Sequence, residues 1–139
     1  MKAYKYRIYP TKQQESTLNN HFAMCRHLYN WSLKERIEAY ETEKRTVSYV
    51  EQANKLPVLK KERAWFKNVY SQVLQNVLKR LDLAFQNFFR RVKNNQTSGF
   101  PKYKKKGTWQ SITYPDYSKT PVNDTITVPK IGIVKIIYH

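Results

Sequence analysis

Four lysines lie close together near residue 100, interleaved with aromatic side chains. The stretch GFPKYKKKG, residues 99–107, contains these lysines, two aromatic residues and a proline. Lysines replace the counterions condensed on nucleic-acid phosphates, and aromatic rings stack on unpaired bases at roughly 1–3 kcal/mol per base. Two interpretations are open: a site that grips an anionic partner, or a solvated loop in which Phe100 and Trp109 pack inward.

Side chains suited to catalysis form no recognisable motif in this sequence. A hydrolase or nuclease needs carboxylates or histidines placed to hold a metal ion or to move protons. The chain has ten acidic residues, and most are glutamates of predicted helix surfaces. No cysteine pair, HxxxH pair, glycine-rich phosphate loop or GxSxG motif occurs. The sequence therefore predicts no catalytic or metal-binding residue; its three aspartates are Asp82, Asp116 and Asp124.

Positive charge is concentrated in the middle third of the chain. The 139 residues carry a formal net charge of +16, and residues 59–107 hold thirteen basic and two acidic residues. Residues 1–58 hold ten basic and six acidic residues, and residues 108–139 hold three and two. Because a uniform solubility coat would not be so uneven, the distribution predicts a polyanionic partner.

Length and composition fit one domain with its own core. A hydrophobic content of 40% argues against general disorder. No apolar run approaches the ~20 residues needed to span a bilayer, and the N-terminus lacks the apolar block of a signal peptide. The single Cys25 excludes an internal disulfide. We therefore expect a cytoplasmic protein with no membrane partner.

The elements that would position the basic residues are mainly helical. Alternating side chains in KAYKYRIYP predict a strand at the N-terminus. Thr11 and Gln14 then have capping-box spacing. Apolar residues recur at steps of three and four from Leu18 to Tyr40, which predicts a long amphipathic helix.

Further helices are expected in the basic middle third. A second capping box, Ser48 to Glu51, predicts a short helix that ends before Pro57. The stretch LKKERAWFKNVY is expected to be an irregular connection with a helical turn. Ser71 is expected to cap a long helix whose inner stripe runs to Val92.

The last part of the chain has the composition of short strands. The segments WQSITY, DTITV and GIVKIIY contain β-branched residues and are separated by turn residues. With the first strand they predict a small antiparallel sheet or split barrel, interrupted by a helical module over about residues 12–94. The predicted fold class is α+β. Its parts are the first strand in residues 1–10, the helical module in 11–98, and the basic loop with the remaining strands in 99–139.

An ordered set of motifs resembles the N-terminal region of the TnpB (OrfB) proteins of insertion sequences. In chain order the motifs are YKYRIYPTKQQ, CRHLYNWSL, LKKERAWF, QVLQNVLKRLDLAFQNFFRR, GFPKYKKKG with the following QS, and VPKIGIVK. Each motif is weak alone, but the set covers almost the whole chain. The family is also related to the compact type V CRISPR effector nucleases.

The resemblance implies an RNA-guided DNA endonuclease encoded by a transposable element. In that family an oligonucleotide-binding (OB)-like barrel, the WED-like part, is split in sequence by a helical recognition, or REC-like, module. A RuvC-like nuclease domain with three metal-binding carboxylates and a zinc ribbon follow, and neither is expected within these residues. The resemblance therefore predicts a DNA- and guide-RNA-binding portion that is not itself an enzyme and is associated with the nucleoid of a prokaryote when bound. No cofactor is expected in this chain, since magnesium and zinc belong to the missing domains.

The family also implies where nucleic acid would bind. The start of the long helix would face the short DNA motif beside the target, and Gln and Asn side chains can read adenine edges. The basic loop would lie against guide RNA or the heteroduplex backbone. The predicted nucleic-acid-binding residues are Tyr49, Ser71, Gln72, Gln75, Asn76, Lys79, Arg80, Arg90, Arg91, Lys102, Tyr103, Lys104, Lys105, Lys106, Trp109 and Ser111.

Other interpretations stay open at this point. An older description of this region as a helix-turn-helix would give similar base contacts with a different geometry. Gln75 could equally be an ordinary exposed helix residue. The chain could also be a regulatory or protein-interaction fragment that binds the full-length protein or another copy, or competes for its guide RNA.

Overall fold

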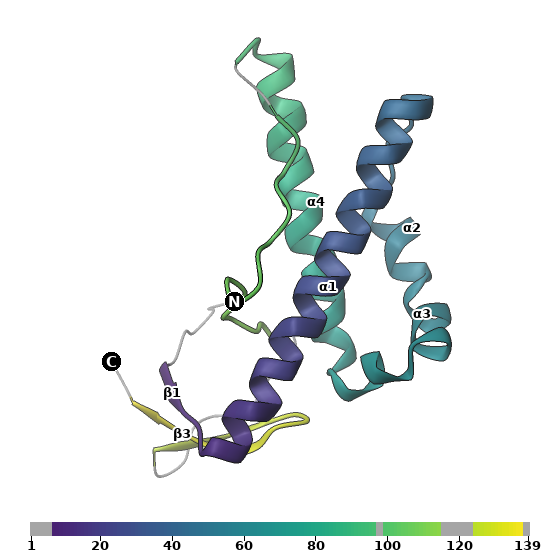
Figure 1. Cartoon of the computed structure of the whole chain (residues 1–139). Helices are drawn as coiled ribbons and strands as arrows, with labels where there is room; N and C mark the ends of the chain where they lie inside the picture. The colour runs from purple at the N-terminus through teal and green to yellow at the C-terminus, as the bar shows by residue number, and fades with distance from the viewer. Residues whose placement is uncertain (1–6, 97–98, 115–123, 138–139) are drawn as a thin grey trace.

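Two long helices form the body of the molecule. The computed structural model describes residues 7–96, 99–114 and 124–137. Helices α1 (Lys12–Glu43) and α4 (Ser71–Lys93) both begin near the sheet and cross each other (Figure 1). The connection between them packs to one side and consists of α2 (Tyr49–Asn54), α3 (Leu56–Glu62) and the 3-10 helix η1 (Ala64–Asn68).

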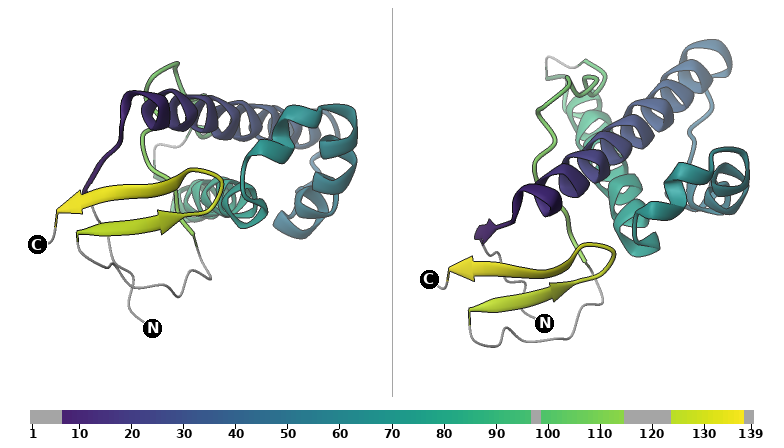
Figure 2. Two further views of the ribbon diagram at one scale, coloured as in Figure 1. Left: turned by 90° about the horizontal axis from the view of Figure 1, so that it is seen from below. Right: turned by 60° about the horizontal axis from the view of Figure 1, so that its bottom comes forward.

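A small sheet lies beside the start of α1 (Figure 2). It contains three strands in the order β1-β3-β2, with β1 (Arg7–Tyr9) and β2 (Thr125–Val128) both antiparallel to β3 (Gly132–Ile137). Ile8 lies opposite Ile136 and Ile126 opposite Val134, and the two β3 residues are buried. Because the first strand pairs with the last, the helices are inserted between β1 and β2. The predicted α+β fold with a helical module and a small sheet is confirmed.

Local sequence signals explain how α1 begins and how it is joined to the sheet. The predicted capping box is present: the Gln14 backbone N–H donates to Thr11 Oγ1, and the Thr11 N–H donates to Gln14 Oε1. The Gln14 side-chain amide also donates to the carbonyl of Ile133 at 2.6 Å. One residue therefore fixes both the start of the helix and the position of β3.

Two predicted details are wrong, and a third is incomplete. The short helix does end before Pro57, since α2 ends at Asn54, but Pro57 lies in the first turn of a further helix, α3, where its missing N–H has no intrahelical acceptor to lose. Ser71 does not cap α4: the N-cap is Tyr70, and Ser71 Oγ accepts a hydrogen bond from Lys60 Nζ at 2.6 Å. WQSITY, residues 109–114, forms no strand.

The hydrophobic core lies between α1 and α4. Both helices contribute fully buried leucines, and α3 and η1 close the core through Leu56 and Phe66. Arg36 of α1 is also buried there, with its guanidinium paired to Asp82 of α4 at 3.1 Å. Within the described residues, no helix is long and apolar enough to cross a membrane.

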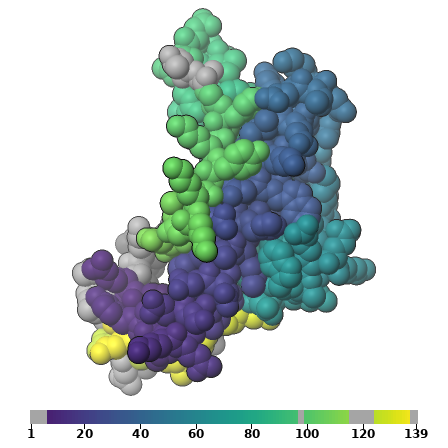
Figure 3. All heavy atoms as spheres, in the orientation of Figure 1, coloured from purple at the N-terminus to yellow at the C-terminus, as the bar shows by residue number. Residues whose placement is uncertain are grey.

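Residues 99–114, which we call the strap, run in an irregular extended path along α4 and across α1. The space-filling view shows them on the face where the two long helices meet (Figure 3). The strap leads from the end of α4 back toward the sheet. The basic loop predicted from sequence is therefore part of the packed body.

Candidate nucleic-acid interface

Apolar side chains attach the strap to the helices. Phe100 packs on Phe88 of α4, with ring centroids 4.9 Å apart, and Trp109 packs on Tyr29 of α1 at 5.4 Å. Ile112 and Tyr114 are partly buried against the same core. The strap therefore has an apolar inner side. Phe100 and Trp109 pack inward, as the solvated-loop interpretation of the sequence expected.

Asn30 of α1 fixes the strap backbone at its most basic point. The Lys104 N–H donates to Asn30 Oδ1 at 2.8 Å, and Asn30 Nδ2 donates to the Lys104 carbonyl at 3.0 Å. The side chain thus satisfies both backbone groups of one residue, as a neighbouring β-strand would. The position of the following lysines is set by this contact.

The strap lysines are all exposed to solvent. Lys102, Lys105 and Lys106 are exposed, and so is Lys104, whose Nζ lies 5.3 Å from the centre of the Tyr29 ring. Tyr103 between them is 51% exposed. Four ammonium groups and one accessible aromatic ring are therefore presented on a backbone that is held in place.

Trp109 and Arg80 are placed differently from the strap lysines. The Trp109 ring is buried, and the Arg80 guanidinium lies over it at 5.0 Å. Arg80 also donates hydrogen bonds to the side chains of Asn76, Ser111 and Thr113. These contacts join α4 to the strap, so in this structure Trp109 offers no free face to a base.

The exposed face of α4 carries most of the other predicted residues. Gln75 and Lys79 are exposed near its start, whereas Gln72 is half-buried. Lys79 Nζ lies 5.6 Å from the centre of the half-buried Tyr49 ring of α2. At the far end of α4, Arg90 is exposed and Arg91 is half-buried. The amides near the helix start are thus separated from the arginines by almost the whole helix.

The aspartates show no arrangement typical of a metal centre. Asp82 accepts hydrogen bonds from Arg36 and from Gln86, so its carboxylate is engaged within the fold. Asp124 is exposed before β2, and Asp116 lies outside the described residues. Across the part of the chain that the structure describes, no group of three or more His, Cys, Asp or Glu side chains could hold a metal ion.

Comparison with known proteins identifies the family. A family model described as a helix-turn-helix domain, named after OrfB, matches residues 1–45. InsQ of Escherichia coli (strain K12), whose name describes an RNA-guided DNA endonuclease, is 33% identical over 95% of this chain and 32% of its own length. A protein of Streptomyces pristinaespiralis with the same kind of name is 37% identical over 93% of this chain and 32% of its own length.

A shorter relative is matched over nearly all of its length. Virulence protein VsdF of Salmonella dublin is 34% identical over 76% of this chain and 94% of its own length. The chain belongs to the TnpB (OrfB) family of insertion sequences. It spans about a third of the length of the two relatives whose names describe endonucleases. Where the TnpB-family helix-turn-helix model matches, the described residues form β1 and one continuous helix, α1.

This TnpB-family chain has a second exposed aromatic and basic cluster, which the site prediction missed. His27 of α1 lies edge-on to Trp31 and to Trp65 of η1, with centroids 6.1 and 5.5 Å away. The Arg63 guanidinium lies 4.5 Å from the Trp31 ring centre. Burial, together with Arg63 and Arg26, lowers the pKa of His27. The sequence signal was the aromatic, basic composition of LKKERAWFKNVY, but only the fold brings it beside α1.

Proposed function

We propose that this chain is a nucleic-acid-binding module that holds DNA and guide RNA for an RNA-guided DNA endonuclease. The strap is the observation that carries the proposal. Its exposed lysines, Lys102 and Lys104–Lys106, stand on a backbone attached to α1 by Asn30 and by buried rings. A pre-ordered set of charges loses little conformational entropy when it binds phosphates. The names of InsQ and of the Streptomyces relative supply the guide RNA and DNA as partner classes.

The strap and α4 are assigned different tasks in this proposal. Lysine ammonium groups are point charges that bind phosphates of any sequence. Gln75 is an exposed amide near the start of α4 and is suited to a base edge in a groove. Losing such a contact costs about 1–3 kcal/mol on the preferred DNA and little on other DNA.

The base-reading task is tested by Gln75→Ala, with Asn87→Ala, an exposed amide further along α4, as the matched control. Binding to preferred and scrambled duplexes should be compared in the guide-RNA complex. We expect Gln75→Ala, but not Asn87→Ala, to reduce the difference in affinity between the preferred and the scrambled duplex. Equal weakening of both duplexes by Gln75→Ala would assign α4 a purely structural role.

We also propose that this chain binds DNA without cutting it. Asp82 is held by Arg36 and Gln86, and the chain spans about a third of the relatives whose names describe endonucleases. Incubation with magnesium, guide RNA and matching DNA should leave the DNA intact. Cleavage that disappears on substitution of Asp82, Asp116 or Asp124 would refute this.

Binding itself is tested by fluorescence anisotropy with labelled RNA and duplex DNA over a series of salt concentrations. Displacement of condensed counterions makes the logarithm of affinity fall linearly with the logarithm of salt. We expect such a line with a slope that reflects several phosphate contacts. Absent or salt-independent binding would contradict the proposed function.

A further inference from the structure

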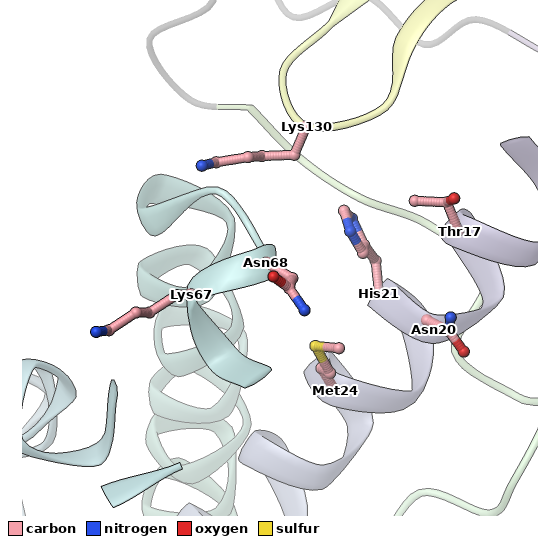
Figure 4. A pocket seen from close by; sticks show the side chains of 7 residues that line it. All are labelled: Thr17, Asn20, His21, Met24, Lys67, Asn68 and Lys130. Atoms are coloured by element: carbon pink, nitrogen blue, oxygen red, sulfur yellow. The ribbon is translucent and has the colours of Figure 1, made fainter. Parts of the chain in front are cut away.

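A cavity of about 300 Å³ lies between α1, η1 and the turn that joins β2 to β3. Its lining includes Asn20, His21 and Met24 of α1, Asn68 of η1 and Lys130 of the turn (Figure 4). The volume equals that of about ten water molecules at ~30 Å³ each. The cavity is therefore too large for a single ion and is suited to a small organic group.

His21 is the most informative residue of the cavity. It is only 3% exposed, yet among the described residues neither of its ring nitrogens makes a hydrogen bond. Figure 4 shows the imidazole rising from α1 toward Lys130. Burial lowers the pKa of His21, so the neutral ring offers one donor and one acceptor. The ring nitrogens are reached from the cavity, so a ligand bound there can pair with them.

The other lining groups define the chemistry of a ligand. The amides of Asn20 and Asn68 provide donors and acceptors in pairs, which match the edge of a nucleobase. Met24 supplies a polarisable apolar surface, and thioethers make favourable contacts with aromatic rings. Figure 4 shows the exposed Lys130 side chain extending along the edge of the cavity, where its ammonium group can meet a phosphate at the rim.

The cavity adjoins the interface already described. Tyr114 of the strap donates a hydrogen bond to the Pro129 carbonyl, in the same turn as Lys130, at 3.1 Å. Its ring stacks on Tyr70, the N-cap of α4, with centroids 5.7 Å apart. A strand that follows the strap toward the start of α4 would therefore arrive at the rim of the cavity.

We propose that this cavity takes one unstacked nucleotide from the nucleic acid bound along the strap. The base lies on Met24 with its polar edge toward Asn68 and His21, and its phosphate faces Lys130. The inference rests on the proposed function, because the remaining nucleotides are held by the strap lysines. It adds a place where the chain contacts a single base away from duplex grooves.

The test fills the cavity without changing charge. Asn68→Trp and, from the opposite wall, Asn20→Trp replace exposed lining amides with a bulky ring. Asn54→Trp, at an exposed site of α2 outside the cavity, is the matched control. The probe is a short single-stranded oligothymidylate with one 5-iodouracil, used for anisotropy and for photo-crosslinking followed by peptide mass spectrometry. Circular dichroism confirms that each variant is folded.

We expect crosslinks in the peptides that contain His21 or Asn68. Both filling variants should lose these crosslinks and bind about 2- to 10-fold more weakly, as loss of one thioether–base contact predicts. The Asn54→Trp variant should behave like the wild type. If the folded filling variants match the control in affinity and crosslinks, the nucleotide site is refuted while nucleic-acid binding stands. If the wild type binds no nucleic acid, the proposed function fails and this inference fails with it.

Discussion

Replacing Asp82 by alanine should destabilise the fold strongly, because this carboxylate is the counterion of a buried arginine. The Arg36 side chain is 3% exposed, and its Nη1 lies 3.1 Å from Asp82 Oδ1. Its Nε donates to Gln52 Oε1 at 2.8 Å, whereas Nη2 is buried without a hydrogen-bond partner in the described part of the chain. In the alanine variant the charge would retain Gln52 as its only hydrogen-bond partner among the described residues.

The size of the effect follows from the burial of both partners. Breaking a buried ion pair by removing one side costs about 3–5 kcal/mol. The Asp82 side chain is 27% exposed, so water can enter the space that it leaves. We therefore expect the lower end, about 3 kcal/mol, which for a chain of this length lowers the melting temperature by roughly 10 °C.

Urea and thermal unfolding, followed by circular dichroism, measure this cost. Asp82→Ala, Arg36→Met and the double variant form a cycle in which the double variant should lose much less than the two single losses combined. Glu38→Ala removes an exposed carboxylate that pairs with Lys34 and should cost less than about 0.5 kcal/mol. A similarly small loss for Asp82→Ala, or additive losses in the cycle, would refute the assigned counterion role.

Three further predictions concern stability and reactivity. Asn30→Ala removes both hydrogen bonds to the Lys104 backbone and should lower the free energy of unfolding by about 1–2 kcal/mol in urea titrations. An unchanged urea midpoint would show that the fold does not depend on these two hydrogen bonds. Burial raises the pKa of the Cys25 thiol to about 12, so iodoacetamide at pH 8 should alkylate Cys25 only in unfolded molecules, and rapid alkylation of folded protein would contradict its burial. Burial lowers the pKa of His21, so the unfolded chain binds a proton more readily than the folded one. The free energy of unfolding should therefore decrease as pH falls below about 6.5, and less so in His21→Leu; equal pH profiles would exclude His21 as the cause.

Elements with strong local signals could be predicted from the sequence. The Thr11 capping box, the apolar stripes of α1 and α4, and the alternating β-branched residues of β2 and β3 each act within a few residues. The charge maximum around the strap lysines was visible for the same reason. A family resemblance spread over the whole chain supplied the order of the parts.

The wrong predictions depend on contacts between distant residues. The stretch from Trp109 to Tyr114 has the composition of a strand, but its side chains pack against α1 and α4 instead of pairing with a sheet. Ser71 satisfies its hydroxyl with Lys60, so it does not cap the helix. Neither outcome can be predicted from the spacing of neighbouring residues in the sequence.

The candidate site shows the same difference between features set by local sequence and features set by contacts between distant residues. The predicted lysines are exposed, but their fixed presentation depends on Asn30, which lies 74 positions before Lys104 in the chain. The cluster of His27, Trp31 and Trp65 exists only because η1 packs beside α1. Sequence gives the kinds of side chain available, whereas tertiary contacts decide which of them face solvent.

The salt dependence of binding, measured on two matched lysine variants, tests the central claim most directly. Lys105→Ala with Lys106→Ala removes two exposed strap charges, and Lys12→Ala with Lys34→Ala removes two exposed charges of α1. Each lost phosphate contact should reduce the slope of log affinity against log salt by about one. For the strap variant, the slope of log affinity against log salt should therefore be shallower by about two, and binding to every sequence should be weaker. The α1 variant should keep nearly the wild-type slope. Equal slopes in the two variants would contradict the claim that the strap holds nucleic acid.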